Sequence, residues 1–191
     1  MATFDGDVRS AGVTSEKRLM AEAAVRGDIT QEILRGFGFG LHIATVTPAA
    51  GDDCFLQIQN TSADPLVVAS LEFEDAAAED IYGVTGAAYA GVSSGAAVTP
   101  TFTNLLMGST NLYTAKALVL ADTDLTGQLT TEIEVFRETT GAGARHYIDL
   151  ARRPVVLGQN QCFSLFAATG GAAITLLNLA WYHIVTPNED A

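Results

Sequence analysis

The most constraining feature of this sequence is a pair of long apolar runs near its C-terminal end, residues 161–169 and 173–185, separated by Gly170-Gly171. Neither run has the caps or charges of a helix, and both are rich in the aromatic and β-branched residues that favour strands. Glycine adopts the positive φ of a tight two-residue turn without steric strain. The pattern therefore predicts a β-hairpin over residues 161–185.

The second run would be apolar on both faces if it were extended. One face carries Ile174, Leu176, Ala180, Tyr182 and Ile184, and the other carries Leu177, Leu179, Trp181 and Val185. A strand in a two-sheet sandwich needs only one apolar face, so the second face requires a cover. We expect another subunit to supply part of that cover, and we predict Leu177, Leu179 and Trp181 as subunit-interface residues.

The rest of the chain after residue 36 shows short strand patterns separated by glycine-rich turns. The predicted strands are residues 41–47, 53–60, 66–74, 98–104, 114–120, 129–137, 145–150 and 154–157. Residues 76–100 read as a long loop rich in Ala, Gly and Ser. The pattern predicts an all-β fold, a jelly-roll-like β-sandwich over residues 37–187, with a C-terminal tail at 188–191.

Residues 1–36 differ from this body and are predicted to form an arm with two short helices. Ser15 can cap a helix over residues 16–26, and Asp28 can cap a second helix that ends near Gly36. Because helices this short are not stable alone in water, the arm must pack on its own body or on a partner. The predicted partner-binding residues are Arg9, Lys17, Arg18, Leu19, Ile33 and Leu34.

The charge distribution limits the classes of partner. The net charge is −12, whereas residues 1–35 alone hold five basic and six acidic side chains. A strongly acidic chain lacks the basic surface that nucleic-acid binding requires. No apolar run reaches the roughly 20 residues of a membrane span, and the first residues do not form a secretory signal. We therefore expect no nucleic acid and no membrane as partners, and a protein made in a cytoplasm.

The residues that carry chemistry are few and scattered. His42, His146 and His183 are separated by whole predicted strands, and neither a nucleophile elbow nor a phosphate loop is present. Cys54 and Cys162 are expected to be buried thiols, and the sequence leaves open whether they lie near each other. We predict no catalytic residues, no metal, no cofactor and no enzymatic activity.

Several segments, taken in order, resemble small β-rich virion proteins of tailed bacteriophages. The resemblance covers residues 37–185 and departs from that group at Gly158-Gln159, where Pro-Gly usually follows the apolar run. It is carried by the Gly-Phe-Gly-Phe-Gly run at 36–40 and by the runs at 55–61, 98–105, 154–157 and 179–182. The resemblance implies a jelly-roll-like protein of the virion surface that is not an enzyme, binds the capsid or the tail, and is often oligomeric.

Three functions remain in view. The first is a capsid decoration (cement) protein, a homotrimer assembled in the host cytoplasm, that binds the major capsid protein or another virion protein. The second is the head of a tail or head fibre that recognises host glycan through the 76–100 loop, with Tyr82 and Tyr89 as contacts. The third is a cellular carbohydrate-binding or hydrolytic β domain.

Overall fold

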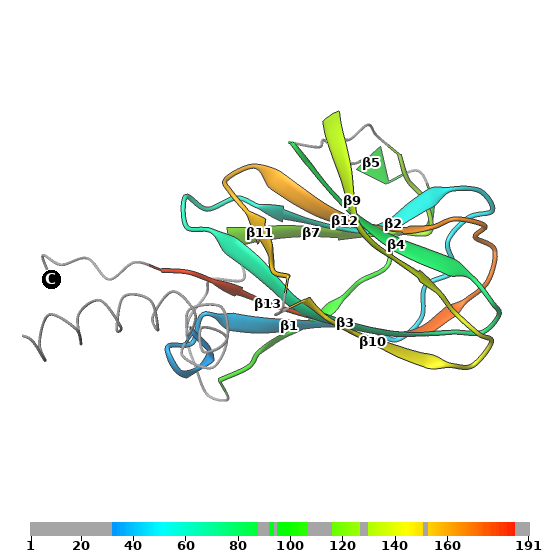
Figure 1. The fold of residues 1–191 in the computed structure, drawn as a ribbon, viewed down its shortest axis with the longest axis horizontal. Coiled ribbons are helices and arrows are strands. Elements are labelled where there is room, and N and C mark those ends of the chain that lie inside the picture. The colour runs from blue at the N-terminus through cyan, green and yellow to red at the C-terminus, as the bar shows by residue number, and fades with distance from the viewer. Residues whose placement is uncertain are drawn as a thin grey trace, which may run out of the picture.

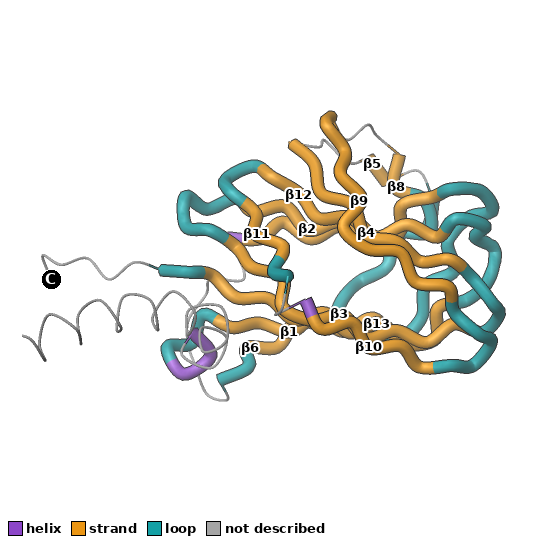
Figure 2. Tube along the Cα trace, in the orientation of Figure 1, coloured by secondary structure: helices purple, strands orange, loops and turns teal. Residues whose placement is uncertain are grey.

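The computed structural model describes residues 32–87, 92–93, 95–106, 116–126, 130–150 and 153–185. These residues form strands joined by turns, with a short helical segment at 32–34 (Figures 1 and 2). The strands are β1 (Gly38–Ile43), β2 (Asp53–Asn60), β3 (Leu66–Asp75), β4 (Asp80–Ala87), β5 (Val92–Ser93), β6 (Thr101–Asn104), β7 (Ala117–Ala121), β8 (Leu125–Thr126), β9 (Thr130–Thr139), β10 (Arg145–Asp149), β11 (Val155–Leu157), β12 (Gln161–Ala167) and β13 (Ile174–His183).

The strands build two antiparallel sheets packed face to face, as Figure 1 shows. Sheet A has the order β10-β3-β13-β1-β6, with β11 also paired to β3, and sheet B has the order β7-β2-β12-β4-β9. Eight strands carry the winding of the chain. Four of them lie in sheet A (β1, β3, β10 and β13) and four in sheet B (β2, β4, β9 and β12). Successive strands of this set alternate between the sheets, except that β4 is followed by β9 in the same sheet. This winding of eight strands is a jelly roll, which confirms the predicted all-β sandwich.

The predicted hairpin at Gly170-Gly171 is wrong. β12 belongs to sheet B and β13 to sheet A, so the glycine pair carries the chain across the sandwich instead of pairing the two strands. Both glycines do have positive φ, 64° and 78°. A Cβ at Gly170 would also overlap the Ala49 carbonyl oxygen. The glycines are therefore required for a tight crossing, and turn chemistry alone could not tell a crossing from a hairpin.

The predicted loop at 76–100 is also wrong over most of its first half. Residues 80–87 are β4, which lies between β12 and β9 inside sheet B. Glycine in a strand marks a close approach, and a Cβ at Gly83 would collide with the rings of Phe136 and Phe163. Tyr82 is buried on the outer face of sheet B, where its ring stacks on Phe166. Tyr89 lies outside the described residues.

The residues of β13 that were predicted to form a subunit interface are buried within the chain itself. Leu177, Leu179 and Trp181 are 1%, 2% and 0% exposed and belong to the main core between the sheets. They lie on the inner face of a central strand, flanked by β3 and β1. Their apolar face is already covered by sheet B, so no second subunit is needed to cover it.

The other face of β13 points away from the core and is apolar only in part. Tyr182 packs with Val67 and Ala69 in a small outer cluster. The pairing of β13 with β3 shifts register between Ile174 and Leu176 and again between Ala180 and Trp181. Bulges of this kind bend a strand and re-aim its side chains. The apolar residues on both faces of β13 are therefore covered by other residues of the same chain.

An insertion between β4 and β9 distinguishes the two sides of the sandwich. Its strand β6 extends sheet A beside β1, and its strand β7 extends sheet B beside β2. We call this side the insertion edge. On the opposite side the sheets end at β9 and at β10 with β11, and we call that side the cleft edge.

Candidate functional site

The predicted partner-binding residues fall into two groups. Arg9, Lys17, Arg18 and Leu19 lie outside the described residues, so their role stays a prediction. Ile33 is half-buried, and Leu34 is 68% exposed.

The segment that carries Leu34 is fixed to the body through Arg35. The Arg35 guanidinium contacts Glu32 at 2.7 Å and donates to the Val185 carbonyl at 3.0 Å. It also lies over the Phe37 ring, 5.0 Å from its centroid. These contacts hold the segment against the end of β13 while Leu34 faces solvent.

The insertion edge exposes two further apolar side chains close to this segment. Phe102 is 43% exposed and Leu105 is 37% exposed. The Leu105 amide donates to the Gly38 carbonyl at 3.0 Å, and the Asn104 side chain donates to the Gly36 carbonyl at 3.0 Å. Backbone contacts thus place this strand end beside the segment after Leu34. We call Leu34, Phe102 and Leu105 the edge patch.

A polar row crosses the outer face of sheet A. His42 Nδ1 and Asn178 Oδ1 are 2.8 Å apart, and Asn178 Nδ2 donates to Glu72 Oε2 at 2.9 Å. Beside this row the sheet has a floor of small residues, Gly40, Ala180 and Ser70, which are cross-strand neighbours. Tyr147, 67% exposed, and Leu105 also line this groove, whose volume is about 290 Å³.

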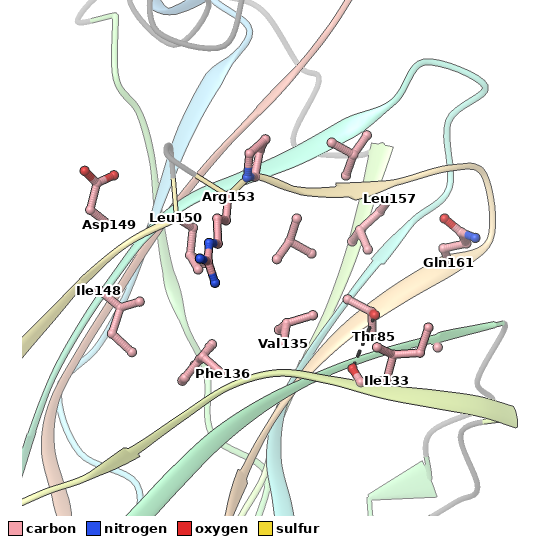
Figure 3. Close-up of a pocket in the computed structure, with 14 residues that line it drawn as sticks. Thr85, Ile133, Val135, Phe136, Ile148, Asp149, Leu150, Arg153, Leu157 and Gln161 are labelled. Carbon is pink, nitrogen blue, oxygen red and sulfur yellow. Dashed lines mark hydrogen bonds between the residues drawn. The ribbon is translucent and has the colours of Figure 1, made fainter.

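A cavity lies at the cleft edge, between β9 of sheet B and the β10–β11 segment of sheet A (Figure 3). Its volume is about 750 Å³. At one end His146 Nδ1 and Glu138 Oε1, 3.4 Å apart, bridge the two sheets. Apolar side chains line most of it: Ile133, Val135, Phe136, Ile148, Leu150, Val155, Val156 and Leu157.

Groups capable of catalysis are dispersed or buried. Burial raises the pKa of the Cys54 thiol to about 12, so the thiolate that would be the nucleophile is scarce at neutral pH. Cys54 lies opposite Phe166 on the neighbouring strand, whereas Cys162 lies opposite Gln59, and the two residues do not form a disulfide. Burial lowers the pKa of His183 to about 4.

The described residues show neither a metal-binding cluster nor a membrane-spanning helix. No group of three or more His, Cys, Asp or Glu side chains is arranged to hold a metal ion. No helix there combines the length and apolar character needed to cross a bilayer.

Comparison with known proteins gives little. No family model and no curated protein matches this chain. Among solved structures, the chain is similar to one from the X-ray structure of tomato aspermy virus, with 9% identity, 80% coverage of each chain and a TM-score of 0.25. A TM-score this low does not establish a shared fold, so the jelly roll rests on the strand order of this chain.

The polar row and the cleft were not predicted from the sequence. His42, Glu72 and Asn178 come from three strands that are distant in sequence, and only the observed register makes them neighbours. The sequence contains one indication of Arg153, because this residue follows Arg152 and precedes Pro154 between two predicted strands. That indication identifies an exposed cation, but not the cavity beside it.

Proposed function

We propose that this chain is a virion structural protein without enzymatic activity, namely a capsid decoration protein of a tailed bacteriophage that stabilises the assembled shell. The observation that carries the proposal is the edge patch, which exposes three apolar side chains where the N-terminal segment joins the body. Apolar side chains exposed along one edge of a sandwich suit contact with a protein partner. The resemblance of residues 37–185 to phage virion proteins supports the same function.

The mechanism follows from mass action. A protein that binds only the assembled shell stabilises that shell by its free energy of binding. Its partner is the major capsid protein or another virion protein, and its location is the virion, assembled in the host cytoplasm. The net charge of −12 disfavours nucleic acid as a partner.

We also propose that the protein is a homotrimer. Because Leu177, Leu179 and Trp181 are buried within one chain, the contacts between copies have to use exposed side chains instead. Sedimentation at micromolar concentration measures the state directly. A monomer in that experiment removes the trimer and leaves the decoration function to be tested separately.

A truncation tests the binding function. Deleting residues 1–35 removes the arm and Leu34 but leaves every strand of both sheets. We expect the truncated protein to fold, with the β-sheet signal of its far-ultraviolet circular dichroism spectrum retained, and to lose binding to phage capsids that lack the decoration protein. Decoration at wild-type occupancy by the truncated chain would contradict the proposal.

The second candidate, a fibre head that recognises glycan, is favoured by the groove on the outer face of sheet A. A flat floor, a fixed polar row and an exposed tyrosine suit a sugar ring, which offers hydroxyls at its edge and C–H groups on its faces. Glycan binding that Tyr147→Ala abolishes would support this candidate. Copy number per particle separates the two: hundreds of copies fit decoration, and a few to a few tens fit a fibre.

A further inference from the structure

The cleft at the cleft edge opens directly onto the core. Leu150, Val155 and Leu157, which line its sheet A side, belong to the main core cluster. Phe136 lines the opposite side and packs against Phe163 of the core. Nearer the solvent, Ile133 is 65% exposed. A ligand entering here would therefore remove apolar surface from water on both sides, which favours an apolar body.

One charged group points into this apolar space. Figure 3 shows the Arg153 guanidinium directed between Leu150 and Val135, whereas the carboxylate of Asp149 points away. The Arg153 amide donates to the Leu150 carbonyl at 3.1 Å, and this hydrogen bond fixes the backbone of Arg153 beside the cleft. Arg153 is also exposed to solvent.

Arg153 differs from the other described arginines in lacking an acidic partner. Arg35 contacts Glu32 and Arg137 contacts Glu134, each at 2.7 Å. Arg145 lies 3.5 Å from carboxylate oxygens of Glu72 and Glu74. Within the described part of the chain no carboxylate pairs with Arg153. In a protein of net charge −12, an unpaired guanidinium facing an apolar cavity is the natural complement of a ligand carboxylate.

The geometry favours a compact ligand over an added strand. β9 is the edge strand here, but its pairing with β4 shifts register between Gly83 and Val84, which leaves Val135 as an extra, bulged residue. A bulge and charged side chains are the devices by which edge strands avoid pairing with other chains. A volume of about 750 Å³ is within the range of small-molecule sites.

We propose that the cleft binds a compact ligand with an apolar body and a single carboxylate, such as a medium-chain fatty acid, and that Arg153 holds the carboxylate. The apolar body lies between the two sheets, against Ile133 and Val135 on one side and Leu157 on the other. The guanidinium donates two parallel hydrogen bonds to the carboxylate oxygens, a geometry that arginine matches and lysine does not. This site is independent of capsid binding, which we place at the insertion edge.

Calorimetric titration of the full chain tests the proposal, with decanoate below its micellar concentration as the probe and decanol as the neutral probe of the same chain length. We expect one decanoate per chain. Arg153→Met keeps the apolar stem and removes the charge, so it should weaken decanoate binding by about tenfold or more and leave decanol binding unchanged. Arg137→Met is the matched control, because its guanidinium lies over Tyr82 on the outer face, 4.2 Å from the ring centroid.

A second variant tests the apolar wall. Ile133→Asp changes an exposed position, so the fold should be retained by circular dichroism while binding of both probes falls. Several results would overturn the proposal: no decanoate binding to the wild type, decanoate binding by Arg153→Met within twofold of wild type, or an equal loss in Arg137→Met. Binding of an acidic apolar hexapeptide but not decanoate would also overturn it and would identify a protein segment as the occupant.

Discussion

The two edges of the sandwich are built from the same jelly roll and present different surfaces. At the insertion edge the chain adds β6 to one sheet and β7 to the other, and it exposes the edge patch beside the N-terminal segment. At the cleft edge the described residues add the short β11 beside β3, and a cavity lies between the two sheets. The comparison teaches that an insertion between two strands can give the two edges of one scaffold different surfaces, an added pair of strands at one edge and a cavity at the other.

The largest expected effect comes from the core strand behind the insertion edge. Trp181 contacts Phe39 and Phe102 with ring centroids 6.0 Å and 6.2 Å away. We expect Trp181→Ala to lower the free energy of unfolding by about 3–5 kcal/mol, because it leaves a large cavity between the sheets. Urea denaturation measures this. An unchanged free energy of unfolding, together with a smaller oligomer, would instead restore the subunit-interface interpretation of this residue.

A pair of phenylalanines compares the stability contribution of the two edges. Phe136 at the cleft edge is half-buried against Phe163, whereas Phe102 at the insertion edge is 43% exposed. We expect Phe136→Ala to cost about 2 kcal/mol and Phe102→Ala about 1 kcal/mol, in proportion to the apolar area that each buries. Urea midpoints of both variants decide the order. The reverse order would mean that the insertion edge is a stabilising element of the core and not a free binding surface.

The buried His183 makes the stability of the protein depend on pH. His183, near the insertion edge, is fully buried, and burial lowers its pKa from 6.5 in a free side chain to about 4. The unfolded chain therefore binds more protons between these values, and stability is lost as the pH falls from about 6.5 towards 4. Burial raises the pKa of Asp75, which has the opposite effect on stability and is common to wild type and variant.

The His183→Asn variant isolates this contribution. We expect the difference in free energy of unfolding between pH 7 and pH 5 to be smaller in the variant than in the wild type. Urea denaturation at both pH values provides the measurement. The same loss of stability in both proteins would show that His183 does not titrate in this range.

The smallest expected effect concerns the contact between His146 and Glu138, which joins the two sheets. His146 Nδ1 lies 3.4 Å from Glu138 Oε1, and the Glu138 side chain is about half exposed. Exposed pairs contribute little, so Glu138→Gln should change the free energy of unfolding by less than about 1 kcal/mol. A loss well above that value, measured at low and high salt, would show that this contact holds the two sheets together.

Sequence patterns were sufficient for the strands whose apolar residues alternate. The predicted strand at 53–60 matches β2, and the predicted strands at 66–74 and 129–137 each lie within one or two residues of β3 and β9. β4 was missed because its small residues, Gly83 among them, have the composition of a loop. They are small because neighbouring rings occupy the space, and that cause is visible only after the chain is folded.

The candidate sites were harder to predict because they depend on pairing between distant segments. The apolar residues of β13 were identified correctly, but their cover was assigned to a second subunit because a single strand does not reveal the opposite sheet. Leu34 was predicted as a partner contact and is exposed, while Phe102 and Leu105 join it only through hydrogen bonds to Gly36 and Gly38. Arg153 and the β9 residues on the other side of the cleft are distant in sequence, so the sequence alone does not show that they share a cavity.

The most direct test of the central claim, that the insertion edge is the adhesive surface, is a sedimentation assay of binding to phage capsids that lack the decoration protein. The assay uses two variants. One carries both Leu34→Asp and Phe102→Asp at the insertion edge, and the control carries Ile133→Asp, which introduces a charge at the cleft edge. We predict that the double variant stays in the supernatant while Ile133→Asp sediments with the capsids as the wild type does. Sedimentation of the double variant at wild-type occupancy, or loss of binding by Ile133→Asp alone, would contradict the claim.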